Sequence, residues 1–371
     1  MTSLLRRMTH VTTLRALRSG GAMTVAHLAR KAGLSRPTVM SLLDELVEQG
    51  WVEEQPPDTS GGMGRPAKRF RFRVKAGYVV GVDIGAHTIR AAIADLSGET
   101  VATRREAIAE HASAPDRLAL ARRLVEATMD EAKCGRGDVL GAAVGTPGIV
   151  DPAGRVTLSV LPEWSGFDLG GRMGRSFTCP VLVENDANLA TLAEHWRGTA
   201  READTVVHVL AGLRFGAGLI IDGKLHRGRS GAAGEIGALD ILGWDEAPRD
   251  LIKAAEPGTG PEAAAQQLFA AAKDLQPHAM RAVERFAQQL AQGIAAMVLT
   301  VDPDVVVVGG GVSLAGKSLL EPLTEHLHRL CLTTPPIRMS ELGDEAVVLG
   351  ALRLALQDVE RRVFAIEDLP I

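Results

Sequence analysis

The stretch "AGLRFGAGLIIDG", residues 211–223, has the pattern of a glycine-rich hairpin. An apolar strand, "TVVHVL", precedes it from Thr205, and the run after Gly218 predicts the returning strand. Glycines in such a bend let the backbone approach a ligand closely, as nucleotide-binding hairpins require. However, the bulky pair Leu213 and Arg214 stands in the bend, where such hairpins use small residues. The stretch therefore raises the question whether the chain keeps such an architecture but has lost its phosphate site.

The rest of the chain repeats the same alternation of strands and helices. Upstream of the hairpin, residues 78–106 predict an antiparallel meander in which Asp83 closes the first strand. Further strands follow in "VLGAAVGTPGIVD" (139–151) and "VLVENDANLATLAEHW" (181–196). Downstream, two Ala-rich helices between about 262 and 299 lead to the strand of "DVVVVGGGV" (304–312). We therefore expect an internal repeat of two α/β lobes, with a ligand-binding cleft between them.

The charge of the chain is unevenly distributed. Residues 1–75 carry 13 Lys and Arg against 6 Asp and Glu, a net charge of +7, while the remainder carries 28 against 39, a net charge of −11. At 371 residues the chain exceeds the size of a single core, so two or three domains are expected. A basic head on an acidic body predicts that the head binds a polyanion.

The basic head has the pattern of a helix-turn-helix. Apolar residues at helical spacing predict a first helix that ends at Gly20 and Gly21, and Thr24 can cap a short second helix. Gly33 can supply the positive φ of a tight turn before the third helix, which Ser35 can cap. The inner face of that helix is expected to consist of Val39, Leu42, Leu43, Leu46 and Val47.

A wing is predicted after the third helix. The segments "WVEEQ" (51–55) and "KRFRFRV" (68–74) can pair as a hairpin around a polar, glycine-rich loop. In that loop Arg65 is expected to enter a narrow minor groove, where negative potential attracts guanidinium groups.

A winged helix of this kind places its third helix in the major groove of double-stranded DNA. The residues expected to contact DNA are Ser35, Arg36, Thr38, Ser41, Arg65 and Lys68. One head makes few base contacts, so a homo-oligomer on a palindromic operator is expected. The alternative, a protein-interaction module, does not explain the charge of +7.

Several classes of protein are excluded. No apolar run approaches the roughly 18 to 20 residues needed to span a bilayer, and the first residues lack a secretory signal, so we expect a cytoplasmic protein that does not enter membranes. The three cysteines, Cys134, Cys179 and Cys331, are far apart and include no C-x-x-C pair. They indicate neither a disulfide framework nor a cysteine zinc site.

The motifs together carry a resemblance to a known family. The chain resembles, over about residues 8–358, transcriptional regulators of the ROK family, which join a winged helix to a sugar-kinase domain of the actin and hexokinase superfamily. The supporting motifs are "GVDIG", "GTPGIVD", "WSGFDL", "VENDAN", "GLIIDGKLHRGRSGAAGEIG" and "LGDEAVVLGALRLAL", in this order. The resemblance implies an α/β protein in which a winged helix-turn-helix precedes a two-lobed, actin-like (RNase H-like) fold.

The domain boundaries follow from this resemblance. We expect the head at 1–75, the first lobe at 76–190 and the second lobe at 191–344. The C-terminal helix, 345–360, is expected to pack back on the first lobe.

The phosphate loops depart from the family pattern. Kinases of the family typically have D-x-G-G-T-K after the first strand, where this chain retains Asp83 and Gly85 but has lost the lysine position. In the second loop Leu213 stands at a hydroxyl position and Arg214 at a glycine position. We therefore expect that ATP binding and kinase activity are lost and that no cofactor is used. A phosphate held by the Arg214 guanidinium is the alternative.

The resemblance also extends to the zinc-binding and sugar-binding positions of the family. The family's zinc histidine corresponds to Ala238, and no cysteine cluster follows, so no metal is expected. The sugar-binding wall is retained: Asn185, Glu235 and the bend at Gly148 match ligand-binding positions, and Asp186 matches the kinase base. Paired carboxylates and amides suit polyols because each hydroxyl both donates and accepts. The alternative is that Asp186 only caps the following helix.

These observations predict a DNA-binding transcriptional regulator, most simply a repressor, that dimerises and senses a sugar or a sugar derivative. Two alternatives stay open. One is an ATP-dependent sugar kinase with an attached DNA-binding head, and the other is a ligand-independent regulator whose body is only a dimerisation scaffold.

Overall fold

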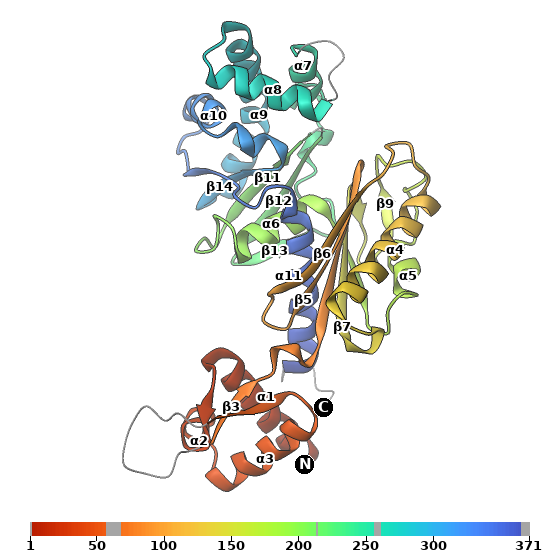
Figure 1. Cartoon of the computed structure of the whole chain (residues 1–371). Helices are drawn as coiled ribbons and strands as arrows, with labels where there is room; N and C mark the ends of the chain where they lie inside the picture. Colours follow the sequence, from red (N-terminus) through yellow and green to blue (C-terminus); the bar gives the residue numbers. More distant parts are fainter. Residues whose placement is uncertain (1, 57–67, 213, 256–260, 365–371) are drawn as a thin grey trace.

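The structure is a computed structural model that describes residues 2–56, 68–212, 214–255 and 261–364. Figure 1 shows three parts: a small helical head at one end, and two α/β lobes that lie beside each other above it. This architecture confirms the predicted fold class of a winged helix-turn-helix joined to a two-lobed α/β body.

The head consists of three helices and a small sheet. Its elements are α1 (Thr2–Gly20), β1 (Met23–Thr24), α2 (Val25–Ala32), α3 (Arg36–Glu48), β2 (Val52–Gln55) and β3 (Arg69–Phe72). The helices enclose a core in which Leu17, Leu28 and Leu43 are fully or almost fully buried. The sheet has the order β1-β3-β2, so the predicted hairpin is present and gains a third strand, β1, that sequence reasoning missed.

Capping residues start α2 and α3 as expected. The Thr24 side chain accepts a hydrogen bond from the backbone N–H of His27, and the Ser35 side chain accepts one from that of Thr38. Gly33 ends α2 with a φ of 68°, a conformation that favours glycine. One detail of the prediction is wrong: Val47 is 41% exposed, because Leu46 already fills the last inward position of α3.

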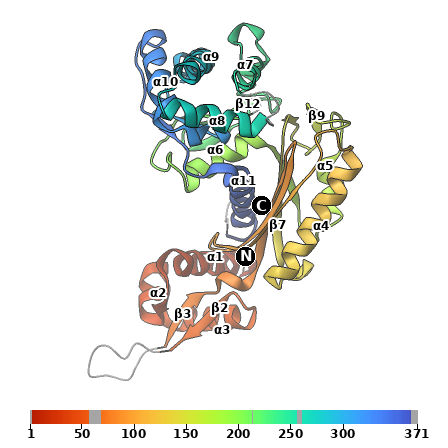
Figure 2. The same ribbon diagram turned by 45° about the horizontal axis from the view of Figure 1, so that its top comes forward.

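The first lobe is built on a five-stranded sheet of order β10-β7-β4-β5-β6. Its strands are β4 (Tyr78–Ile84), β5 (Thr88–Asp95), β6 (Thr100–Ala107), β7 (Val139–Thr146) and β10 (Val181–Asn185). Strands β4, β5 and β6 form the predicted antiparallel meander, and β7 and β10 are added in parallel. Helices α4 (Ala114–Ala132) and α5 (Leu169–Gly174) cover one face (Figure 2). A short hairpin, β8 (Ile149–Val150) with β9 (Val156–Leu158), follows β7.

The second lobe repeats this topology. Its strands, β11 (Val206–Ala211), β12 (Phe215–Ile221), β13 (Lys224–His226), β14 (Val305–Gly309) and β15 (Ile337–Met339), have the order β13-β12-β11-β14-β15. The first three are antiparallel and the last two are added in parallel, as in the first lobe. Its helices are α7 (Ala247–Lys253), α8 (Pro261–Lys273), α9 (Pro277–Val301) and α10 (Lys317–Leu330). The shared strand order supports the internal repeat predicted from the sequence.

Each lobe is followed by a helix that packs on the sheet of the other lobe. Helix α6 (Asp186–Trp196) follows the first sheet but packs on β11 and β12 of the second, whereas α11 (Ala346–Phe364) follows the second sheet and packs on β4 and β7 of the first. The two helices also pack against each other. The close approach depends on glycine: a Cβ on Gly350 of α11 would lie 1.8 Å from the Leu189 carbonyl oxygen of α6. The expected boundary at 190/191 thus falls inside one continuous helix, α6.

The head is attached to the body beside α11. Arg18 of α1 donates to Glu360 of α11 at 2.6 Å and to the Leu96 carbonyl at 3.2 Å. Apolar packing continues through Val74 and Ala76, which link the core of the head to the residues around α11. Within the described ranges, no helix combines the length and apolar character needed to cross a membrane.

Candidate functional site

Three acidic residues from separate elements lie near one another. Asp83 stands near the end of β4, Asp186 begins α6, and Glu235 directly precedes a short 3-10 helix that ends at Ala238. Burial, and next the negative charge of Asp186, raise the pKa of Asp83 to about 7. Burial also raises the pKa of Asp186 to about 6 against a hydrogen bond from the Ala187 N–H, and Glu235 adds a smaller increase. The charge of Asp186 acts on Asp83, and that of Glu235 acts on Asp186, so Asp186 lies near both other carboxyl groups.

Asn185 caps helix α6. Its side-chain oxygen accepts from the Asn188 N–H at 3.0 Å, while its amide nitrogen donates to the Gly148 carbonyl at 3.0 Å. The capping that one alternative assigned to Asp186 therefore belongs to Asn185. Asp186 accepts from the neighbouring Ala187 N–H at 2.9 Å and from its own backbone N–H, and among the described residues no side chain donates to it. A carboxylate with so few local partners is suited to accept from a ligand.

The bend at Gly148 has the conformation that its predicted role requires. Its φ is 116°, and a Cβ there would lie 2.1 Å from the Leu158 carbonyl oxygen. Only glycine fits this position, and the bend thereby presents its carbonyl to Asn185.

Sequence reasoning missed an ion pair beside Asn185 that joins the buried Glu184 to Arg227, whose side chain is 45% exposed. Glu184, 5% exposed, accepts from the Asn185 N–H and the Asn188 side chain at 2.9 Å each. It also accepts from the Arg227 guanidinium. This pair fixes the strand-to-helix junction that carries Asn185 and Asp186, because a buried carboxylate needs several donors. In the sequence, Glu184 could have been recognised as a charged residue at the end of an apolar strand.

A second buried polar group lies between α6 and the second sheet. His208 of β11 is fully buried, and its Nδ1 lies 3.1 Å from the Thr191 hydroxyl. Burial lowers the pKa of His208 to about 4, so the imidazole is neutral near pH 7.

A buried arginine holds the loop that follows β4, at Gly85 and Ala86. Arg117 of α4 is fully buried and donates to the carbonyls of Gly85 and Ala86, at 2.8 and 3.1 Å. It also donates to the carbonyls of Ala109 and Glu110. Burial lowers the pKa of this guanidinium. The periodicity of α4 places Arg117 on the apolar face, a signal that the sequence analysis did not use.

The second loop connects β11 to β12. The Gly212 N–H donates to the Arg214 carbonyl at 3.1 Å, and Ala211 pairs with Phe215. The side chain of Arg214 is exposed, and Leu213 lies outside the described residues.

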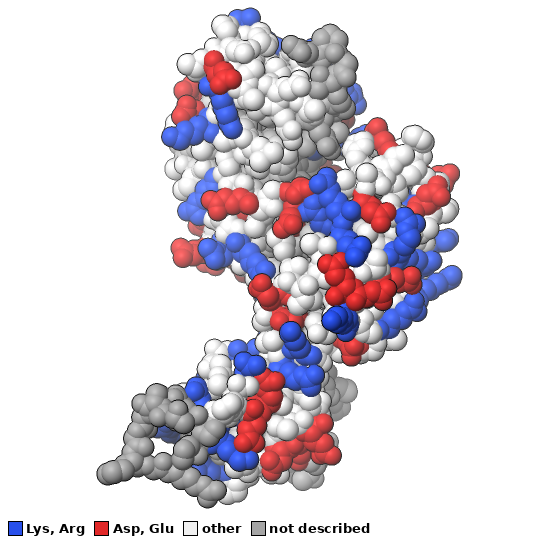
Figure 3. Space-filling view, viewed as in Figure 1, with Lys and Arg blue, Asp and Glu red and all other residues white. Residues whose placement is uncertain are grey.

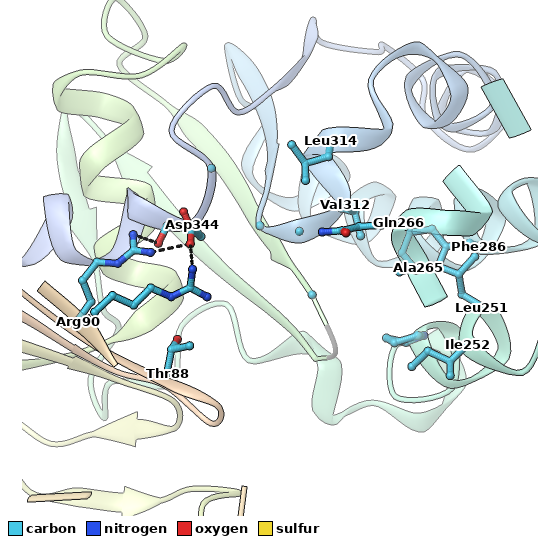
Figure 4. A pocket seen from close by; sticks show the side chains of 16 residues that line it. Thr88, Arg90, Leu251, Ile252, Ala265, Gln266, Phe286, Val312, Leu314 and Asp344 are labelled. Carbon is cyan, nitrogen blue, oxygen red and sulfur yellow. Dashed lines mark hydrogen bonds and ion pairs between the residues drawn. The ribbon is translucent and has the colours of Figure 1, made fainter. Parts of the chain in front are cut away.

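A pocket of about 570 Å³ opens between the lobes above these loops (Figure 4). Thr88, Arg90 and Arg105 line one end, and Asp344, which precedes α11, faces them. Arg90 donates to the Asp344 carboxylate at 2.6 Å and to its carbonyl at 2.7 Å, and Arg105 lies 3.2 Å from the same carboxylate. The opposite end is apolar and is lined by Leu251, Ile252, Ala265, Phe286, Val312 and Leu314. Asn185, Asp186 and Glu235 do not line this pocket.

The five predicted DNA-contacting residues that the structure describes are exposed on the head. Ser35, Arg36, Thr38 and Ser41 are all exposed at the amino end of α3, although the hydroxyls of Ser35 and Thr38 also bond to each other at 2.7 Å. Lys68 shares a shallow groove with Arg36 and pairs with Glu54 at 2.9 Å. Arg65 lies outside the described residues.

The charges of the head are not gathered into one basic stripe. On the face in Figure 3, acidic side chains lie over the head among the Lys and Arg residues. Asp44, Glu45 and Glu48 all belong to the carboxyl half of α3. Because phosphates repel these carboxylates, only the amino half of α3 is suited to DNA.

No group of three or more His, Cys, Asp or Glu side chains within the described ranges is arranged to hold a metal ion. Ala238 is the last residue of the short 3-10 helix that follows Glu235. It stands at the position where the resemblance places the zinc histidine.

Two family models match the chain. The model of the ROK family matches residues 79–246 and 247–358, and that of the MarR family matches residues 5–61.

The chain is similar to both regulators and kinases. It is 26% identical to a xylose repressor of Caldicellulosiruptor bescii over 96% of this chain and 97% of that protein. It is 28% identical to a glucokinase of Halalkalibacterium halodurans over 74% of this chain and 93% of that enzyme. A solved ROK family transcriptional regulator, a homologue of the Escherichia coli Mlc protein, has the same fold: the TM-score is 0.75 at 21% identity, with 98% of this chain and all of that chain covered.

Proposed function

Because the chain belongs to the ROK family, we propose that it is a DNA-binding transcriptional repressor whose kinase-like body senses a sugar or a sugar derivative. The observation that carries this proposal is the exposed, polar amino end of α3 on a winged helix, joined to the body beside α11. The similarity to a xylose repressor along nearly the whole of both chains supports it.

In this proposal Arg36, Thr38 and Ser41 enter the major groove, while Arg65 in the wing enters the adjacent minor groove. Ser35 holds the end of α3, and Lys68 binds phosphate. Two heads of a dimer bind the two halves of a palindromic operator, since one head offers few base contacts. We place the protein in the cytoplasm, where the DNA is.

The first test is sequencing of genomic fragments bound by the full chain, followed by titration of the operator so found. We expect Arg36→Ala to weaken specific binding by roughly 1 to 3 kcal/mol, because a guanidinium on a base edge contributes about that much. Arg15→Ala, which removes the same charge from an exposed site on α1, is the matched control and should have little effect. Equal losses in both variants would contradict the proposed docking of α3.

The sugar site in this proposal consists of Asn185, Asp186, Glu235 and the bend at Gly148. It is supported by the cluster of carboxyl groups and by the few local partners of Asp186. A ligand bound there bears on both α6 and the second lobe, so its binding energy can alter the lobe arrangement. To change operator affinity tenfold, it needs about 1.4 kcal/mol of differential binding between the two arrangements.

A panel of monosaccharides and their derivatives, added to the operator titration, tests this site. We expect one sugar to shift operator affinity in the native chain, and Asp186→Asn to remove the shift. Glu163→Gln, an exposed acid of the same lobe, should retain it. If no sugar changes operator affinity or melting temperature, the body is a dimerisation scaffold instead.

Loss of kinase activity belongs to this proposal as well. The missing lysine of the first loop and the bulky Leu213 and Arg214 of the second argue against a seated triphosphate. One observation favours the alternative, a sugar kinase with a DNA-binding head: Asp83 and Asp186 are both retained and lie together. Turnover of Mg-ATP with a sugar in a coupled assay, abolished by Asp186→Asn, would establish that alternative.

A further inference from the structure

A shallow groove between α2 and α3 of the head has an apolar floor. Residues from the starts of both helices and one residue before β3 line it: Thr24, Val25, Ala26, Arg36, Pro37, Met40 and Lys68. Figures 1 and 2 show α3 on the side of the head that faces away from the two lobes, so the body does not cover this helix.

Met40 belongs to this groove and not to the core of the head. The core face of α3 consists of residues that are at most 5% exposed, namely Val39, Leu42, Leu43 and Leu46. The side chain of Met40, in contrast, is 39% exposed. Together with Val25, Ala26 and Pro37 it forms a contiguous apolar surface, which marks an interaction site more strongly than a single exposed apolar side chain does.

Cationic side chains border the apolar floor. Arg36 precedes Met40 by four residues, so the two lie on the same face of α3. Lys68 borders the groove as well, and no Asp or Glu among the described residues lines it. The Thr24 hydroxyl oxygen already accepts from the His27 N–H at 3.2 Å. The groove therefore suits a polyanion that presents an apolar group.

DNA presents such a group in its major groove. The base edges there display hydrogen-bond donors and acceptors, and thymine adds an apolar C5-methyl group. Four residues of a helix rise by about 6 Å, and successive base pairs are about 3.4 Å apart. Met40 can therefore reach a base within about two base pairs of the one that Arg36 contacts.

We propose that this groove holds the C5-methyl group of a thymine and that Met40 determines the specificity for that base. The inference rests on the proposed function and deepens it, because it names a chemical group that each half of the operator must carry. The methyl group packs against Met40 and Pro37, while Arg36 and Lys68 bind the neighbouring base edge and phosphate.

Operator titration with single thymines replaced by deoxyuridine tests the proposal, because this change removes the methyl group and keeps the base pair. In each half-site we expect one position at which the native chain loses affinity about fourfold, as for one buried methyl group. Met40→Ala should bind the thymine and deoxyuridine forms equally, whereas Met40→Leu should retain the difference. Met8→Ala, at a methionine of α1 that is 36% exposed, is the matched control and should retain it too.

Two results would overturn this inference alone. One is a native chain whose affinity no deoxyuridine substitution changes, and the other is a difference that persists undiminished in Met40→Ala, with circular dichroism verifying that the variant is folded. In both cases a selective loss of operator binding in Arg36→Ala would still support the proposed function. A native chain that binds no DNA fragment specifically would overturn the inference and the proposed function together.

Discussion

Asp83 and Asp186 hold protons in the folded protein more tightly than free aspartates do, because burial raises the pKa of both and a neighbouring negative charge adds to the increase. A group with a raised pKa in the folded state stabilises the fold at low pH and loses that contribution as the pH rises. For Asp83, with a pKa raised from 3.8 to about 7, the loss falls between about pH 4 and pH 7.

We therefore expect the difference in unfolding free energy between Asp83→Asn and the native chain to change with pH. The native chain loses stability relative to the variant from pH 4 to pH 7, because asparagine does not titrate. Urea denaturation at several pH values measures this difference, and His208, which acts in the opposite direction, cancels because both proteins contain it. Asp130→Asn, at an exposed site on α4, is the control. A constant difference across the range would contradict the environment assigned to Asp83.

The polar residues around the candidate site differ in how well the sequence predicts their roles. Asn185, Asp186 and Glu235 carry a motif, and their neighbourhood was expected from it. Arg117 binds four carbonyl groups from two loops, yet no local motif marks it. Its role depends on how α4 packs below the first sheet, which only the folded chain determines.

At the scale of elements, the contact between α6 and α11 joins the two lobes. A Cβ on Gly350 would come within 1.8 Å of the Leu189 carbonyl, and one on Gly81 of β4 within 2.8 Å of the Val348 carbonyl. Close packing of α11 against α6 and β4 therefore depends on glycine, which has no side chain, at positions 350 and 81.

We expect Gly350→Ala to lower the free energy of unfolding by about 3 kcal/mol, because α6 and α11 must move apart to admit the methyl group. Gly174→Ala is the matched control: it also lies in a helix, α5, and its Cβ would meet nothing within 4 Å. That change should stay below about 1 kcal/mol. Chemical denaturation compares the two, and similar losses in both would contradict the close crossing.

The helices and strands were the features of this chain that the sequence predicted best. The helices of the head, their caps and the meander follow from periodicity and from Thr24, Gly33 and Ser35. Strand β1 escaped prediction because two residues show no periodicity, and it forms only because β3 offers it a partner. Val47 was misplaced for a similar reason, since the helical pattern cannot show where the facing core ends.

At the scale of the whole molecule, α11 lies between the two lobes and the head. Glu360 accepts from Arg18 of the head at 2.6 Å and from Arg353 of its own helix at 3.2 Å. Glu360 therefore connects α11 to α1, and we expect a shift of α11 to reach α1 through this contact.

We expect Glu360→Gln to loosen the head from the body while both remain folded, because Arg18 loses its anionic partner. Hydrogen exchange of the α1 amides, followed by mass spectrometry, should become faster in the variant. Glu341→Gln, at an exposed site away from this contact, should leave exchange unchanged. If Glu360→Gln exchanges at the native rate, apolar packing alone holds the head.

The sequence by itself determined the winged helix and the two α/β lobes, because periodicity, capping and contiguous motifs encode them locally. The tertiary structure alone decided the exchange of α6 and α11, the Glu184–Arg227 pair and the binding of Asp344 by Arg90, a residue 254 positions away. The physical reason is that these contacts join charges and backbones that are distant along the chain. No local pattern specifies which distant partner a buried charge will meet until the sheets and helices have packed.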